Sequence, residues 1–287
     1  MLFHNSFSIS IRTDMADEAH RLWQSSCGDK SKLSGVICNE HKVRGLTLTE
    51  IIILDEQGEK ALSKARGKYY SIMLPKNFDR GSEYFTDVVL TLSEVIKMCS
   101  LNPDSSVLVA ALGNPDITPD ALGNLAASNI LVTAHLDKKE FPQFSSLSLC
   151  RPGVLGTSGI ESALQIKAIS DYINPSLIIV IDALAGSEPE RVCQCIQISD
   201  AGISPGSGVG NNRREISYNS IGVPVISIGI PTVIDAGYFA GENFNGMFVT
   251  PRNIDSQVRN GARLIAYGVN LAVHSGLTIE DVDAFIG

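Results

Sequence analysis

The stretch SLIIVIDAL, residues 176–184, decides the fold class. It is a short and almost continuous apolar run, which is typical of a strand in a parallel sheet that is covered on both faces. SSVLVAALGN (105–114) and VPVISIGI (223–230) have the same character. In SLIIVIDAL, Asp182 directly follows the apolar residues LIIVI. A carboxylate is rarely buried without a partner that compensates its lost hydration. This stretch therefore predicts a buried strand and also points to a chemical role.

Amphipathic segments separate these apolar runs, and their spacing predicts helices between the strands. Helices are predicted over 13–24, 59–67, 82–100, 159–173, 253–276 and 278–287, with another beginning near 118–120. Further strands are predicted over 46–54, 68–75 and 129–136. Thr13 or Asp14 is the expected cap of the first helix. Strands that alternate with helices predict an α/β fold with a mostly parallel sheet. Without a repeat, low-complexity tract or linker, one domain over 1–287 is the simplest arrangement.

The composition is that of an ordinary globular protein. Of the 287 residues, 44% are hydrophobic and 19% charged, which is ample for a sizeable core. The formal net charge of −8 gives no broad electrostatic attraction for nucleic acid. The chain lacks the pattern of a signal peptide, and no apolar run approaches the roughly 20 residues of a membrane helix. We therefore expect a soluble, cytoplasmic protein without a membrane or direct nucleic-acid partner.

The six cysteines are scattered and contain no CxxC pair. Their spacing favours reduced structural thiols in a reducing compartment, and zinc binding is the alternative. Cys193 and Cys195 form a CxC, and strand alternation would place both on one face.

Three aspartates follow two of the apolar runs. Asp116 and Asp120 come after 105–114, and Asp182 lies near the end of 176–184. Sites in open α/β sheets lie beyond the carboxyl ends of the strands. Two carboxylates held close together there share a proton, so that one acts as base and the other as acid, and such a pair can activate water against an amide. The alternative is that Asp120 and Asp182 cap helices.

Two other features suggest binding chemistry. SPGSGVGNNRR (204–214) is rich in glycine, but no GK[ST] follows, so a substrate-contacting loop is favoured over a phosphate site. His135 is the only one of the five histidines near the aspartates. It could complete an Asp/Asp/His metal site, although a lone histidine is more often structural.

Several motifs together resemble the germination proteases of spore-forming bacteria. They are GNPDITPDALG (113–123), RPGVLGTSGIES (151–162), IVIDALA (179–185), ERVCQCIQISDAGISPGSGVGNNRR (190–214) and GVPVISIGIPTVIDA (222–236), with ISIRTDMADEAH (9–20) and MFVTPRNIDSQVRNGARLIAYGVNLAVH (247–274) at the two ends. The segments occur in the family's order and at similar spacing, so the resemblance covers nearly the whole chain.

The resemblance implies a three-layer α/β/α fold like that of the hydrogenase maturation proteases. It implies an aspartic-type endopeptidase without a cofactor, whose catalytic aspartates are Asp120 and Asp182 but not Asp116. The implied substrates are small acid-soluble spore proteins, cut during germination in the spore core. Members of the family are made as zymogens with a short amino-terminal propeptide and assemble as tetramers.

The chain also departs from the family's pattern. Only about eleven residues precede RTD, so a propeptide at about 1–11 would be short. The segment between 236 and 247 is shorter than in the family. Basic residues are replaced by Ala134, Ser187 and Ser204. Two alternatives stay open: a metal-dependent peptidase of the same fold with Asp/Asp/His ligands, and an inactive homologue that binds spore proteins, which these departures would support.

Overall fold

The computed structural model describes residues 13–27, 33–99, 101–102, 105–211 and 213–286. Within these residues, nine strands form one sheet in the order β1-β2-β3-β7-β8-β6-β4-β5, and β9 pairs with β8. The strands are β1 (Val36–Val43), β2 (Leu46–Ile53), β3 (Gly67–Met73), β4 (Val107–Ala111), β5 (Leu147–Cys150), β6 (Leu177–Gly186), β7 (Cys195–Ser199), β8 (Val225–Asp235) and β9 (Phe248–Val249).

The strands β8, β6, β4 and β5 run parallel, which confirms the predicted parallel centre. Both β4 and β6 are buried almost throughout, as expected for strands that are covered on both faces. The last pair of the β4–β6 ladder joins Ala111 to Ile181. Strand β6 continues past this point to Gly186, so the end of β4 lies beside the middle of β6.

The strands β1, β2, β3 and β7 run antiparallel, and this half of the sheet was not predicted as such. β1 and β2 form a hairpin whose turn residues, Arg44 and Gly45, both have positive φ. Such a turn matches the twist of the two strands. β1 lies at the edge of the sheet with six consecutive exposed residues, so its sequence lacks the apolar alternation that identifies a strand.

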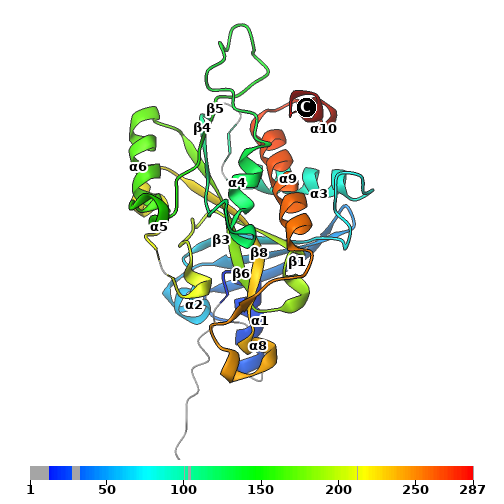
Figure 1. The fold of residues 1–287 in the computed structure, drawn as a ribbon, viewed down its shortest axis with the longest axis vertical. Coiled ribbons are helices and arrows are strands. Elements are labelled where there is room, and N and C mark those ends of the chain that lie inside the picture. The colour runs from blue at the N-terminus through cyan, green and yellow to red at the C-terminus, as the bar shows by residue number, and fades with distance from the viewer. Residues whose placement is uncertain (1–12, 28–32, 100, 103–104, 212, 287) are drawn as a thin grey trace, which may run out of the picture.

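Helices cover both faces of the sheet, which confirms the three-layer α/β/α architecture (Figure 1). α3, α4 and α9 pack on one face, while α6 and α7 pack on the other over the parallel strands, with α1 and α2 beside them over β2 and β3. The helices are α1 (Ala16–Cys27), α2 (Glu56–Leu62), α3 (Phe85–Met98), α4 (Leu122–Ala127), α5 (Leu155–Ser158), α6 (Ser162–Ile173), α7 (Tyr218–Ile221), α8 (Gly237–Ala240), α9 (Ile254–Val273) and α10 (Ile279–Ile286). Four 3₁₀ turns join them: η1 (Thr118–Asp120), η2 (Pro189–Arg191), η3 (Ser207–Val209) and η4 (Glu242–Phe244).

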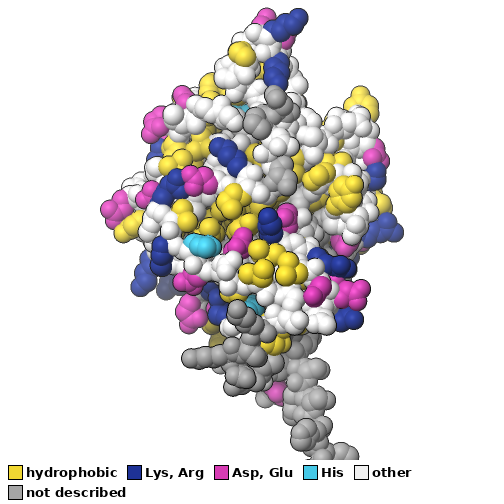
Figure 2. Space-filling model, turned by 180° about the vertical axis from the view of Figure 1, so that it is seen from behind, with side chains coloured by type: hydrophobic (Ala, Val, Ile, Leu, Met, Phe, Trp, Pro, Cys, Tyr) yellow, Lys and Arg dark blue, Asp and Glu magenta, His cyan; other side chains and the backbone are white. Residues whose placement is uncertain are grey.

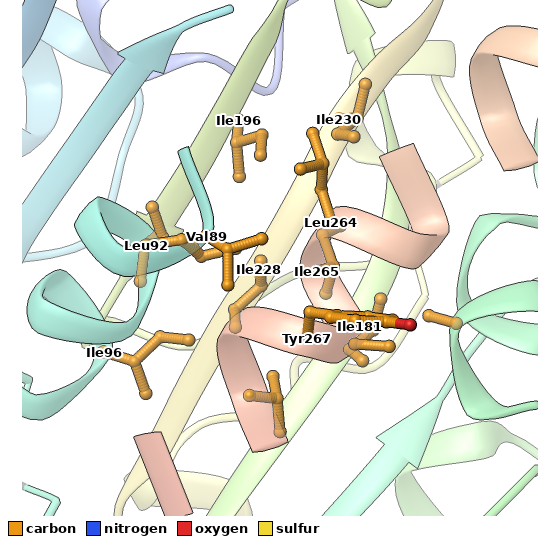
Figure 3. Packing of buried hydrophobic residues seen from close by; sticks show 14 of the residues in the cluster. Val89, Leu92, Ile96, Ile181, Ile196, Ile228, Ile230, Leu264, Ile265 and Tyr267 are labelled. Carbon is orange, nitrogen blue, oxygen red and sulfur yellow. The ribbon is translucent and has the colours of Figure 1, made fainter. Parts of the chain in front are cut away.

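The largest part of the core lies between the sheet and the pair α3–α9. Figure 3 shows Val89 and Leu92 of α3 facing Ile228 of β8, with Leu264 and Ile265 of α9 alongside. Each of these five side chains is at most 1% exposed. Burying a side chain of this size contributes about 1.5–3 kcal/mol, so this layer holds the strands that carry the aspartates in a fixed register.

The predicted strand 129–136 is wrong, and β5 takes its place beside β4. Side chains bind the backbone of this segment instead of a ladder. The amide of Asn270 accepts from Leu131 N–H at 3.0 Å and donates to Asn129 O at 2.8 Å. The hydroxyl of Thr133 accepts from Leu147 N–H at 3.1 Å. The run NILV therefore forms no strand, and within it Ile130 is buried while Val132 is exposed.

The helix predicted over 59–67 begins earlier and ends earlier. Asp55 caps it, accepting from Gln57 N–H at 2.9 Å and from Gly58 N–H at 3.1 Å. Ser63 ends it in the left-handed conformation, and Gly67 already belongs to β3. The cap was missed because the apolar periodicity starts one turn after it.

Acidic and basic side chains are interspersed on the face drawn in Figure 2, and the described side chains form no continuous basic patch there. No helix in the part of the chain that the structure describes is long and apolar enough to cross a membrane.

Candidate active site

Asp182 lies within β6, four residues before the strand ends at Gly186. Its backbone pairs with Gly229 of β8, and its side chain is only 6% exposed. One carboxylate oxygen accepts from the N–H of the next residue, Ala183, at 3.0 Å. Asp182 therefore caps no helix, and the helix-cap alternative is wrong for it.

Asp120 lies at the end of the short turn η1, which folds back over the end of β4. Its Oδ2 accepts from Asn114 N–H at 2.7 Å, so it does not cap the following helix α4. This fold-back depends on Gly113, which has a φ of +96°. A Cβ at this position would lie 1.8 Å from the backbone oxygen of Asp120, which excludes every other residue type without a shift of the chain.

Asp120 and Asp182 line one cleft of about 530 Å³. The structure thus brings together the two aspartates that the sequence singled out. Asp116 is exposed and is not among the residues that line this cleft. The walls are largely apolar and come from four segments: the turn before Asp120, the start of α5, the end of β6 and the glycine-rich loop, which contribute Ile117, Pro119, Val154, Leu155, Leu184, Pro205 and Val209.

Burial of the two carboxyl groups changes their acidity. Burial raises the pKa of Asp182 well above its usual range, and the negative charges of Asp120 and Asp14 raise it further. The pKa of Asp120 is also raised by burial, but the N–H of Asn114 opposes that shift. Because two neighbouring carboxylates resist double ionisation, the pair is suited to hold one proton between them.

Asp14 is a third carboxylate on the cleft, and sequence reasoning missed it. Its Oδ2 accepts from Ala185 N–H at 2.8 Å, and its Oδ1 accepts from the Ser207 hydroxyl at 2.6 Å. The expectation that Asp14 caps α1 is therefore wrong. Asp14 lies within ISIRTDMADEAH, one of the motifs that carry the family resemblance, and this is the sequence signal that could have pointed to it. The resemblance assigned no role to Asp14.

The glycine-rich loop forms one wall of the cleft through Pro205, Gly206 and Val209. Asn211 and Arg213 also line it. This is where a substrate-contacting loop is expected, and contact with a substrate stays a prediction.

His135 is exposed and is not among the residues that line the cleft. The described residues contain no group of three His, Cys, Asp or Glu side chains arranged to hold a metal ion. The Asp/Asp/His alternative thus lacks its third ligand in this arrangement.

The cysteine side chains that the structure describes are free thiols: Cys38, Cys99, Cys150, Cys193 and Cys195. The prediction that Cys193 and Cys195 share a face is wrong, because they pack in different core clusters. Cys193 has a φ of +58° and precedes β7, so strand alternation does not extend to it.

A second group of buried acids lies where α1 meets η2. Asp17 and Glu18 are at most 1% exposed, and both pair with the buried guanidinium of Arg191. Glu18 Oε2 also accepts from the Thr13 hydroxyl at 2.6 Å and from Ser187 N–H at 2.6 Å. Burial raises the pKa of Glu18, while these hydrogen bonds and Arg191 oppose the shift. This cluster anchors α1 to the segment that follows β6.

Comparison with known proteins identifies the family. A family model described as germination protease matches residues 12–245. The chain belongs to the germination protease family. The germination protease of Caldanaerobacter subterraneus subsp. tengcongensis is 39% identical over 97% of this chain and 98% of its own length. That of Clostridium tetani is 34% identical over 97% and 100%, and that of Bacillus cereus is 36% identical over 95% and 77%. As a germination protease relative, the chain is a hydrolase of peptide bonds that acts on a protein substrate.

Comparison with solved structures finds the NiFe hydrogenase maturation protease HycI of Thermococcus kodakarensis. It is 18% identical, matches 62% of this chain and 98% of its own, and gives a TM-score of 0.36.

The three positions where basic residues were expected lie in different places. Ser187 donates to Glu18 within the buried acid cluster, with its Oγ 2.8 Å from Oε2. Ser204 lines a separate pocket of about 330 Å³ on the other side of Asp14. Ala134 is exposed and away from the cleft lining. The alignment with the Caldanaerobacter protein spans 324 residues, more than the length of this chain, so that relative carries segments absent here.

Proposed function

We propose that this chain is an aspartic-type endopeptidase that degrades small acid-soluble spore proteins during germination. The observation that supports it most is the pair Asp120 and Asp182, two carboxyl groups on one largely apolar cleft with raised pKa values. Such shifts cluster at catalytic sites, because burial and like charge tune acids and bases for proton transfer.

In this proposal the two aspartates divide the acid and base roles. Asp120 is the less buried of the two, and its charge adds to the burial that raises the pKa of Asp182, so Asp120 is the group that ionises first and takes a proton from water. Asp182 holds the shared proton and gives it to the departing amine. The water oxygen bonds to the carbonyl carbon of the substrate, and the C–N bond breaks. Asp120 receives one proton of the water, and the amine leaves with the proton that Asp182 held.

The shape of the cleft supports an extended, flexible substrate. It is lined by the end of β6 and by apolar side chains from several loops, which suits a peptide segment rather than a folded domain. Production as a zymogen, assembly as a tetramer and location in the spore core are further parts of this proposal and come from the family resemblance. The possible propeptide at about 1–11 lies outside the described residues.

The experiment that tests this function is cleavage of a purified small acid-soluble spore protein. The chain would be compared with Asp120→Asn and Asp182→Asn, each with and without a chelator. Cleavage by the parent, loss in both variants and indifference to the chelator are expected. Inhibition by the chelator would favour a metal-dependent peptidase. A folded parent that binds the substrate without cutting it would favour an inactive binding homologue.

A further inference from the structure

Asp14 joins three segments that are far apart in the sequence. It exchanges two hydrogen bonds with Ala185: its N–H donates to Ala185 O at 2.8 Å, and Ala185 N–H donates to its Oδ2 at 2.8 Å. Its other oxygen accepts from the hydroxyl of Ser207 at 2.6 Å. One carboxylate thus connects the start of α1, the end of β6 and the glycine-rich loop.

The bond to Ala185 falls beside a bulge in the β6–β8 ladder: Leu184 pairs with Pro231 and Ala185 with Val233, so the extra residue, Thr232, lies in β8. The register of β6 against β8 shifts between Leu184 and Ala185, just beyond Asp182. Bulges of this kind bend a strand and re-aim its side chains, and they are frequent beside active sites. Ala185 is only 1% exposed, so its N–H needs a partner, and a buried N–H without one costs about 1–3 kcal/mol. Asp14 supplies that partner and so fixes the end of β6 beside the bulge.

The glycine-rich loop rests directly on the same carboxylate. Gly208 is buried, and a Cβ there would lie 2.4 Å from Asp14 Oδ2 and 2.7 Å from Ala185 Cβ. This contact, together with the Ser207 bond, fixes the loop that forms one wall of the cleft.

We propose that Asp14 is a positioning residue for the aspartate pair: it fixes the end of β6 and the 204–211 loop around the cleft, and so sets the placement and surroundings of Asp182. This inference rests on the proposed endopeptidase function. Asp14 acts through its backbone and hydroxyl partners, and the proton transfers stay with Asp120 and Asp182.

The charge of Asp14 adds to this effect. Two acids, Asp14 and Asp120, raise the pKa of Asp182 in addition to burial. Glu161 and Arg213 also line the cleft. On the other side of Asp14, the amino group of the half-buried Lys64 donates to Thr13 O at 2.7 Å. Removing the Asp14 charge leaves these other groups in place, so the pKa of Asp182 should fall.

The activity test compares Asp14→Asn, Ser207→Ala and the control Asp116→Asn. Asp116 is an exposed acid in the same segment as Asp120 and is not among the residues that line the cleft. We expect Asp14→Asn to lower kcat about a hundredfold, the usual effect of a small misplacement. Ser207→Ala keeps the charge and frees the loop, so KM should rise several-fold with kcat near the parent's. Asp116→Asn should match the parent.

A titration without substrate separates this inference from the proposed function. The carboxyl carbons of aspartate are labelled with ¹³C, and the Asp182 signal is assigned by its loss in Asp182→Asn. A lower titration midpoint of Asp182 in Asp14→Asn than in the parent and in Asp116→Asn is expected. The parental midpoint in Asp14→Asn would overturn the inference whatever the value of kcat.

Failure of the proposed function and failure of the inference on Asp14 are thus distinguishable. If the parent does not cut the spore protein, the proposed function fails and the titration alone decides the role of Asp14. If Asp14→Asn does not fold, Ser207→Ala decides it, and a parental KM in that variant would overturn the inference.

Discussion

Two groups of buried acids in this chain have opposite environments. Asp17 and Glu18 are the more deeply buried, yet each lies against the guanidinium of Arg191, and Glu18 also accepts hydrogen bonds. Asp120 and Asp182 line a cleft, face each other's charge, and receive only backbone N–H bonds. The first arrangement offsets part of the lost hydration of the acids with ion pairs and several hydrogen bonds, although burial still raises the pKa of Glu18. The second offsets it with one backbone N–H bond for each acid and places like charges together, which costs stability and retains a proton for chemistry.

The largest expected effect is on activity. Asp120→Asn and Asp182→Asn should each lower kcat/KM by about four orders of magnitude, and the double variant should be no worse than either single one, because the two groups act as a unit. Steady-state kinetics on a spore protein substrate measures this. Additive losses would instead indicate two independent roles.

Breaking the structural cluster should cost stability. Arg191→Met leaves Glu18 buried without its cation and Asp17 with only the more exposed Arg21, so the free energy of unfolding should fall by about 3–5 kcal/mol. The matched control is Arg21→Met: Arg21 also pairs with Asp17, but its side chain is 39% exposed, so its loss should cost at most about 1 kcal/mol. Urea unfolding of both variants tests the difference, and equal losses would contradict it.

The same kind of substitution should have opposite signs in the two groups. Asp182→Asn removes a buried acid whose ionisation the fold resists and should stabilise the protein at pH 7 by about 0.5–2 kcal/mol. Glu18→Gln places an amide against Arg191 and should destabilise it by about 1–3 kcal/mol. Thermal unfolding at pH 7 measures both, and a loss of stability in Asp182→Asn would remove the distinction between the groups.

The gain in Asp182→Asn should depend on pH. The pKa of Asp182 is higher in the folded protein than in the unfolded chain, so the folded state binds this proton more tightly. Stability is therefore lost as pH rises from the unfolded pKa towards the folded one. The difference between Asp182→Asn and the parent should vanish in acid and grow towards neutral pH in unfolding experiments across that range.

The smallest expected effect is a shift of the pH–rate profile. The profile of the parent should be bell-shaped, with the acid limb reporting ionisation of the pair's first carboxyl and the alkaline limb loss of its remaining proton. Added salt should leave the alkaline limb in place, because buried charges are screened little. A single sigmoidal limb would show that only one carboxyl group matters.

Much of the fold and the pair of aspartates could be predicted from the sequence. The parts that could not be predicted have physical causes. The apolar runs of β4, β6 and β8 predicted the parallel centre, and aspartates after two such runs predicted the cleft. The edge strand β1 could not be found because its exposed residues carry no apolar alternation. The role of Asp14 could not be found either, since its partner Ala185 lies 171 positions away and only the folded chain brings them together.

The buried acid cluster was missed for a similar reason. ADEAH reads as an ordinary start of a helix, in which acids favour the first turn. Only the packing of η2 against α1 shows that Asp17 and Glu18 face the interior and that Arg191 lies between them.

The attachment of Asp14 to Ala185 also limits where the polypeptide can be shortened or permuted. Amino-terminal residues are commonly trimmed as dispensable, because chain ends usually contribute little to a domain. Here a deletion that reaches Asp14 would remove a hydrogen-bonding partner of β6 and a wall support of the cleft. The carboxyl-terminal helix α10, at the opposite end of the molecule from α1 in Figure 1, is the safer place for a purification tag.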